Sequence, residues 1–182
     1  MISNIVLIGF MGCGKSSIER RLAIRLGFGF QDSDELISTG AGMSISDIFA
    51  LEGEERFREM ETTELEKLTG ASGIVLATGG GAILRAENRE LLHRIGLVVW
   101  LHADPSILFE RASRSRKRPL LEVENPRSTF NALLDSRMPV YQDTADLKVD
   151  ASGLSHEQTV ELILRLTEEG GFRVGFPPKN TD

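Results

Sequence analysis

One stretch decides the fold of this chain: Gly9-Phe-Met-Gly12-Cys-Gly14-Lys15-Ser16, which directly follows the apolar run Ile5–Ile8. It fits G-x-x-x-x-G-K-[ST], the P-loop pattern, whose glycines let backbone N–H groups turn inward around a polyphosphate. Lys15 would reach the outer phosphates and the Ser16 hydroxyl would ligate Mg²⁺. A helix beginning near Lys15 would point its positive dipole end at the same anion. The stretch therefore predicts a strand, a phosphate-binding loop and a helix, with a nucleoside triphosphate or a similar compound as ligand.

The composition is that of one soluble domain. A length of 182 residues fits a single domain with its own core, and 41% apolar with 26% charged residues is typical of globular proteins. The formal net charge of −6 argues against a nucleic-acid surface. A single cysteine excludes an internal disulfide and fits a reducing compartment. Since no apolar run approaches the ~18 residues of a membrane span, we expect a cytoplasmic protein without a membrane partner.

Short apolar runs recur along the chain, and helical patterns separate them. The runs are Ile5–Ile8, Ile74–Ala77, Leu97–Leu101 and Leu147–Val149, with a weaker one at Phe28–Phe30. This alternation predicts βαβ units and a parallel sheet covered by helices on both faces.

Local signals predict where several helices begin. Asp104 before Pro105 combines a capping carboxylate with a proline suited to the first turn. The segment Ser155–Gln158 reads as a capping box that opens the last helix. A helical stretch from about Ser46 should break near Gly53, before a charged helix over residues 54–68. Residues 170–182, rich in glycine and proline, should form a loose tail.

Two aspartates close the second candidate strand, in the segment Asp32-Ser33-Asp34. Ligands of open α/β sheets gather at the carboxyl ends of the strands. One carboxylate would then hold Mg²⁺ and the other would accept a hydrogen bond from a substrate hydroxyl. The residues alone favour a turn with a helix cap over this functional interpretation, because Asp and Ser suit both structures.

Three glycines follow the strand candidate Ile74–Ala77, in the segment Thr78-Gly79-Gly80-Gly81. Backbone without side chains allows a ligand to approach closely and leaves N–H groups to bind an oxygen. A flexible turn is the alternative. This strand does not end in an aspartate, so the magnesium carboxylate would have to come from elsewhere, which favours Asp32.

Three arginine-containing stretches stay open on the residues alone. Arg58 lies on the charged helix, where a pair with Glu54 four positions earlier would make it an ordinary surface residue. Arg137, in an R-x-P-x-Y segment, is equally undecided. The basic residues 116–118 precede an acidic loop that contains proline, a pattern that fits a lid over about residues 113–126.

The chain resembles the shikimate kinase family from Ile5 to about Leu166. The resemblance rests on six segments in this order: G-F-M-G-C-G-K-S, D-S-D, F-R, T-G-G-G, R-P-L-L and R-x-P-x-Y. It implies a P-loop NTPase domain of the nucleoside-monophosphate-kinase type, with a five-stranded parallel sheet in a three-layer α/β/α arrangement, a lid, and an acceptor-binding helical segment at about residues 33–62. The implied reaction is transfer of the ATP γ-phosphoryl group to the 3-hydroxyl of shikimate, in chorismate and aromatic amino-acid biosynthesis.

The resemblance also assigns residues by position. On the nucleotide side it implies contacts from Gly12, Cys13, Gly14, Lys15, Ser16, Ser17 and Arg118 of the lid, with Mg²⁺ at Ser16 and Asp32. On the acceptor side, Asp34 would hold the reacting hydroxyl, and Arg58 and Arg137 would hold the carboxylate. The remaining acceptor contacts would be Phe49, Phe57, Glu61, Gly79, Gly80 and Gly81. Catalysis is then assigned to Lys15, Asp34 and Arg118.

Rival functions remain at this stage. A kinase for another small polyol or sugar acid, such as gluconate, and a catalytically silent ATP-binding module both fit a P-loop. A signalling GTPase is disfavoured, because the chain has no Asn-Lys dipeptide and its one D-x-x-G, Asp150–Gly153, follows the last strand. One departure from the family concerns the base of the nucleotide, since Leu154 stands where relatives commonly carry Arg or Gln. We expect a monomer that binds ATP and shikimate.

Overall fold

The computed structural model describes residues 2–114 and 124–175 of the chain. Helices and strands follow one another in the order expected of βαβ units. They are β1 (Asn4–Ile8), α1 (Lys15–Leu26), β2 (Gly29–Asp32), α2 (Ser33–Ala41), α3 (Ile45–Leu51), α4 (Gly53–Leu68), β3 (Ile74–Ala77), the 3₁₀ turn η1 (Ala82–Leu84), α5 (Ala86–Ile95), β4 (Leu97–His102), α6 (Pro105–Ser113), α7 (Pro126–Thr144), β5 (Leu147–Asp150) and α8 (His156–Glu169).

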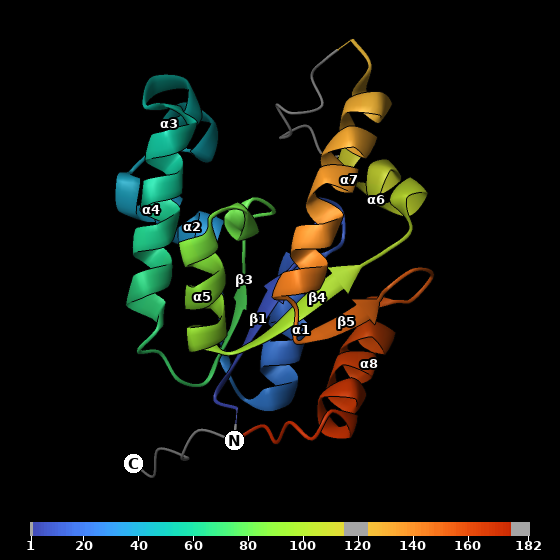
Figure 1. The fold of residues 1–182 in the computed structure, drawn as a ribbon. Coiled ribbons are helices and arrows are strands. Elements are labelled where there is room, and N and C mark those ends of the chain that lie inside the picture. Colours follow the sequence, from blue (N-terminus) through green and yellow to red (C-terminus); the bar gives the residue numbers. More distant parts are fainter. Residues whose placement is uncertain (1, 115–123, 176–182) are drawn as a thin grey trace.

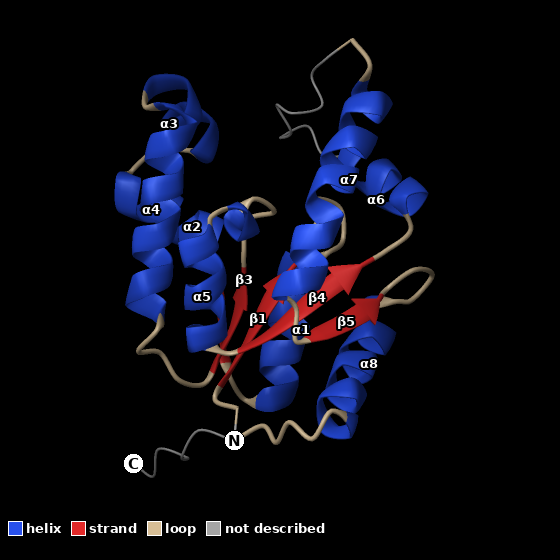
Figure 2. Ribbon diagram, viewed as in Figure 1, coloured by secondary structure: helices blue, strands red, loops and turns tan. Residues whose placement is uncertain are grey.

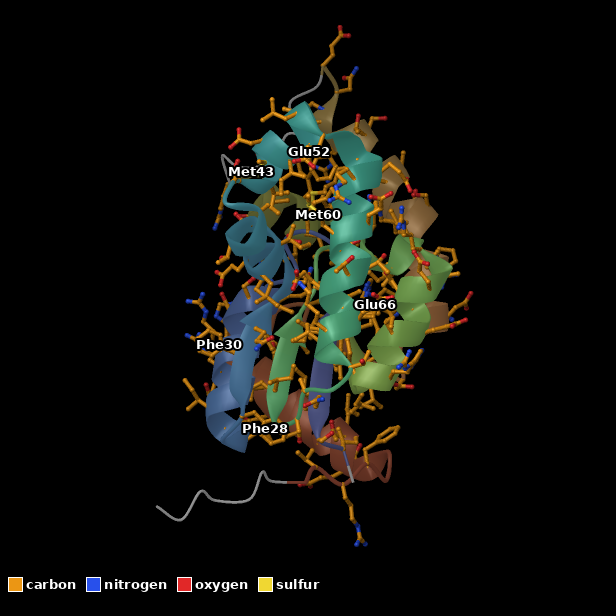
Figure 3. The ribbon with its side chains drawn as sticks, turned by 90° about the vertical axis from the view of Figure 1, so that its left-hand side faces the viewer. Phe28, Phe30, Met43, Glu52, Met60 and Glu66 are labelled. Atoms are coloured by element: carbon orange, nitrogen blue, oxygen red, sulfur yellow. The ribbon has the colours of Figure 1, made fainter. Side chains whose placement is uncertain are left out.

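The five strands form one parallel sheet in the order β2-β3-β1-β4-β5 (Figure 2). Helix α1 lies on one side of the strands and α5 on the other (Figure 3). The chain leaves β1 towards β2 but leaves β3 towards β4, in opposite directions along the sheet. Right-handed crossovers then send the two connections to opposite faces. The carboxyl ends of β1 and β3 therefore form a switch point, where α/β folds bind ligands.

Buried side chains on the central strands build the main core. Residues Ile5–Ile8 of β1 are fully buried, as are most residues of β3 and β4, because helices cover both faces. The predicted fold class is thereby confirmed: a five-stranded parallel sheet stands between two layers of helices.

A second, smaller core joins the three helices inserted between β2 and β3. Ile37 of α2, Ile48 of α3 and Phe57 of α4 are buried against one another. Met43 and Met60 pack around them, on the side of the molecule that faces the viewer in Figure 3. This insertion rises beside the carboxyl edge of the sheet, opposite α6 and α7 (Figure 1). It carries most of the residues that the sequence assigns to the acceptor.

Several local predictions are confirmed. Asp104 caps α6 by accepting a hydrogen bond from the Ser106 backbone, and both bonds of the capping box are present at Ser155 and Gln158. The break before α4 occurs at Gly53, whose φ of 86° strongly favours glycine. The weaker strand candidate was placed slightly too early, since β2 covers Gly29–Asp32.

Two predicted segments lie largely outside the described residues. Helix α6 ends at Ser113 and α7 begins at Pro126, so most of the lid predicted over residues 113–126, with Arg118, cannot be placed. Of the predicted tail, residues up to 175 are described, and Val174 forms a parallel bridge with Ile2. Within residues 2–114 and 124–175, no helix is long and apolar enough to cross a bilayer.

Candidate active site

The P-loop has the backbone that its glycines permit. Gly12 and Gly14 have φ angles of 85° and 90°, a region that residues other than glycine rarely adopt. A Cβ at Gly12 would stand 2.4 Å from the carbonyl oxygen of Leu108, so the loop also packs too closely for any side chain. Gly14 is the N-cap of α1 and offers no capping side chain. The first backbone N–H groups of α1 are thus available to an anion.

Lys15 lies folded over its own loop. Its Nζ donates to the carbonyl oxygens of Gly9 at 2.6 Å and Phe10 at 3.3 Å, and contacts the Cys13 Sγ at 3.5 Å. Cys13 is buried beneath the loop, where a small side chain fits. The ammonium group of Lys15 therefore lies against the backbone of the P-loop.

Asp32 connects the P-loop helix with the acceptor segment. One carboxylate oxygen, Oδ1, accepts a hydrogen bond from the Asp34 backbone at 3.0 Å and caps α2. The other, Oδ2, accepts from the Ser16 hydroxyl at 2.9 Å. The helix-cap interpretation of this segment is confirmed, and the same side chain also lies beside the P-loop serine.

Ser16 and Asp32 form a pair of oxygen donors that suits Mg²⁺. This ion usually keeps several waters and takes one or two protein oxygens together with substrate phosphates. Within the described part of the chain, no group of three or more His, Cys, Asp or Glu residues could hold a metal by itself. The donor set therefore fits an ion bound jointly with a nucleotide.

Two carboxylates converge on the backbone of Gly79. A Cβ at this glycine would stand 2.7 Å from the Asp34 Oδ1 and 3.2 Å from the Glu61 Oε1. The Ser33 hydroxyl accepts a hydrogen bond from the Gly79 N–H at 3.1 Å, which joins the first turn of α2 to the glycine run. Only glycine leaves both carboxylates room at this point.

Arg58 and Glu61 form a buried ion pair on α4. The Arg58 Nη1 donates to the Glu61 Oε2 at 2.9 Å, and the two side chains are 12% and 0% exposed. Burial raises the pKa of Glu61 to about 7, although the Arg58 charge opposes this shift. Arg58 is therefore not an ordinary exposed surface residue, although its predicted pair with Glu54 is present.

Arg137 and Tyr141 approach the glycine run from α7. Both donate to the carbonyl oxygen of Gly80, Arg137 through Nη1 at 3.3 Å and Tyr141 through its hydroxyl at 2.6 Å. Their spacing of four residues places them on one helix face. The Arg137 guanidinium also lies over the Phe10 ring, with 5.6 Å between Cζ and the ring centroid. This contact ties α7 to the P-loop as well.

An apolar wall stands beside Arg58. The rings of Phe49 and Phe57 lie 4.7 Å apart between centroids, and the Arg58 Cζ is 5.1 Å from the centroid of Phe57. Phe57 is buried, whereas Phe49 is 37% exposed. An aromatic surface of this kind suits the carbon skeleton of a small ring.

The structure thus gathers the predicted residues around one place, where the P-loop and the glycine run meet. A Cβ on Gly80 would be 3.5 Å from the Gly9 carbonyl oxygen, which shows how closely the two loops approach. Arg118 lies outside the described residues. Sequence reasoning missed two contributors, Ser33 and Tyr141. The R-x-P-x-Y segment contained a signal for Tyr141 that was given no role.

Comparison with known proteins agrees with this geometry. The family model described as "Shikimate kinase" matches residues 11–168. The shikimate kinase of Cupriavidus pinatubonensis is 44% identical over 94% of this chain and 89% of its own length. That of Thioalkalivibrio sulfidiphilus is 48% identical over 90% of this chain and 86% of its own.

Solved structures of shikimate kinases are also similar to this chain. The shikimate kinase of Acinetobacter baumannii, solved in complex with shikimate, superimposes with a TM-score of 0.90 at 40% identity and covers 95% of this chain and 97% of its own. A gluconokinase from Sinorhizobium meliloti shares the fold alone, with a TM-score of 0.55 at 19% identity over 93% of this chain and 96% of its own. Fold, site and relatives agree, and the chain belongs to the shikimate kinase family of ATP-dependent kinases.

Proposed function

We propose that this chain transfers the γ-phosphoryl group of ATP to the 3-hydroxyl of shikimate, giving ADP and shikimate 3-phosphate for chorismate and aromatic amino-acid biosynthesis. One observation carries the proposal: two arginines and two acidic side chains surround a glycine run that touches the P-loop. An acceptor that carries a carboxylate and hydroxyl groups matches these partners.

The acceptor carboxylate is bound by Arg58 and Arg137. Each guanidinium offers N–H donors in a planar fork that fits a carboxylate. Both side chains are anchored, Arg58 by Glu61 and Arg137 by the Gly80 carbonyl. Phe49 and Phe57 supply the apolar wall for the ring. Gly79, Gly80 and Gly81 let the substrate approach the backbone.

Asp34 holds the reacting hydroxyl. Its Oδ1 lies 2.7 Å from the point at which a Gly79 Cβ would stand, at the border between the glycine run and α2. In this position it accepts a hydrogen bond from the acceptor hydroxyl, aligns its oxygen with the phosphoryl group and takes up its proton as the bond to phosphorus forms.

The P-loop holds the nucleotide. Backbone N–H groups of residues 12–17 surround the phosphates, and Lys15 leaves its own loop carbonyls to contact the transferred group. Ser16 and Asp32 hold Mg²⁺. When bound, this ion neutralises charge on the β- and γ-phosphates. The family resemblance also assigns Arg118, which lies outside the described residues, to the ATP phosphates as a further positive charge.

We further propose a monomeric cytoplasmic enzyme that binds neither nucleic acid nor membrane. The net charge of −6 and the single cysteine, which is buried, support this view. The chain acts as one domain, with residues 33–62 as the acceptor segment.

The test is an assay of ADP release with and without shikimate and Mg²⁺. We expect release that depends on both, with shikimate 3-phosphate as the product. Equal turnover with gluconate would favour a sugar-acid kinase instead. ATP binding without turnover of either acceptor would identify a silent nucleotide-binding module.

A further inference from the structure

The guanidinium group of Arg58 is held by two glutamates on two different edges. Glu54, one turn earlier on α4, accepts from Nη2 at 3.1 Å and from Nε at 3.4 Å. Glu61, one turn later, accepts from Nη1 at 2.9 Å. Three of the five N–H donors are thus engaged within the described part of the chain. One hydrogen on each of Nη1 and Nη2 is left for a ligand.

Gly81 lies close to the guanidinium group of Arg58. A Cβ on Gly81 would stand 2.4 Å from Nη2, 2.7 Å from Nη1 and 2.8 Å from Cζ. The point is closer to both nitrogens than to the carbon between them, so it lies in front of the Nη1–Nη2 edge. The Gly81 backbone therefore packs against this edge, and a side chain at this position would collide with the guanidinium.

We propose that Glu54 is a positioning residue for the acceptor carboxylate, a role that rests on the function proposed above. By binding the Nε–Nη2 edge, it fixes the rotation of the guanidinium about its long axis. The N–H donors of Arg58 that neither glutamate engages are then held in one orientation for the substrate carboxylate. Glu61 binds Nη1 alone and by itself fixes this orientation less completely.

The exposure of the partners indicates where the effect should appear. Glu54 is 64% exposed, whereas Arg58 is 12% exposed. An exposed ion pair within a helix contributes little to the stability of the fold. Orientation of a binding group before the substrate arrives, in contrast, lowers the cost of binding. Loss of Glu54 should therefore change affinity for the acceptor more than folding.

The experiment compares Glu54→Gln and Glu54→Ala with the wild-type enzyme, and uses Glu55→Gln as the matched control. Glu55 lies in the same first turn of α4, is exposed, and pairs with Arg85 rather than Arg58. The control therefore removes the same charge from the same helix end. KM and kcat are measured for shikimate and for ATP, together with equilibrium binding of shikimate and thermal unfolding.

We expect KM and Kd for shikimate to rise by about threefold to tenfold in Glu54→Gln and further in Glu54→Ala, with KM for ATP nearly constant. Gln keeps one acceptor oxygen and should rank between wild type and Ala. The control should resemble wild type, and all variants should unfold at similar temperatures.

Unchanged shikimate constants in both Glu54 variants would overturn the inference while the wild-type enzyme still phosphorylates shikimate. A lower KM would also overturn it, because Glu54 would then compete with the substrate for Arg58. A wild-type enzyme that neither binds nor phosphorylates shikimate would overturn the proposed function, and this inference with it.

Discussion

The hydroxyl of Tyr141 donates a 2.6 Å hydrogen bond to the carbonyl oxygen of Gly80, across 61 residues of sequence. Burial raises the pKa of Tyr141, so the hydroxyl remains protonated and acts as a donor. The ring is 1% exposed and stacks on Trp100 of β4, with 5.8 Å between centroids. The glycine run is therefore fixed to α7 by a side chain that is itself held in the core.

Tyr141→Phe should weaken both the fold and acceptor binding. It leaves the Gly80 carbonyl with only the longer Arg137 bond, a loss of about 1–2 kcal/mol. The melting temperature should fall by roughly 2–8 °C, and KM for shikimate should rise more than KM for ATP. Calorimetry and steady-state kinetics would measure both. Identical kinetics in the variant would mean that the hydroxyl is not needed to place the glycine run.

Gly79→Ala should impair turnover while ATP binding is retained. The added methyl group would stand 2.7 Å from the Asp34 Oδ1 and 3.2 Å from the Glu61 Oε1, so at least one carboxylate must move. Displacement of a positioned group by about 1 Å can cost roughly a hundredfold in rate. The measurement is kcat/KM for shikimate beside the Kd for ATP. Wild-type kcat/KM would show that this crowding is relieved without cost.

Asp34→Asn should leave ATP binding nearly unchanged and greatly reduce kcat. The amide has almost the same shape but takes up no proton, and it can present a donor where the hydroxyl needs an acceptor. Its Oδ1 can still occupy the position near Gly79. Single-turnover assays with saturating shikimate would isolate the chemical step. Normal turnover would remove Asp34 from the mechanism.

Glu19→Gln should change how stability depends on pH. Glu19 is 1% exposed, and within the described residues its Oε1 has no hydrogen-bond partner. Burial, and next the negative charge of Asp32, raise the pKa of Glu19 to about 8 from its ordinary 4.5.

Since the folded-state pKa is the higher one, the contribution of Glu19 to stability is fully present below about pH 4.5 and is lost as the pH rises through about 8. Glutamine does not titrate. The free energy of unfolding of the variant should therefore rise relative to that of wild type as the pH increases through this window. At pH 8.5 the variant should be more stable than wild type by about 1–3 kcal/mol. Urea unfolding at several pH values would show this. A pH-independent difference between the two proteins would contradict it.

Much of the fold follows from the sequence because its signals are local. The strand runs, the P-loop, the Gly53 break and the capping box each depend on a few neighbouring residues. Local signals do not predict that helix α7 continues past Pro139. Proline in a helix interior removes a hydrogen bond and normally ends the helix. Packing of Phe130, Leu134 and Tyr141 into the core holds this helix together.

Motifs indicated which residues belong to the candidate site, but not which contacts these residues make. Its membership followed from the family resemblance, residue by residue. The residues alone left the exposure of Arg58 open, because a charged helix usually faces solvent and only the tertiary structure brings Gly81 against it. The contacts of Ser33 and Tyr141 join residues that lie 46 and 61 positions apart from their partners, and no local pattern encodes them.

The two carboxylate oxygens of Asp32 connect the first turns of two helices. One oxygen begins α2 at the Asp34 backbone, and the other bonds Ser16 at the start of α1. Asp32 therefore joins the start of the P-loop helix to the first turn of the helix that carries Asp34, so a substitution of this one carboxylate would alter both helix starts.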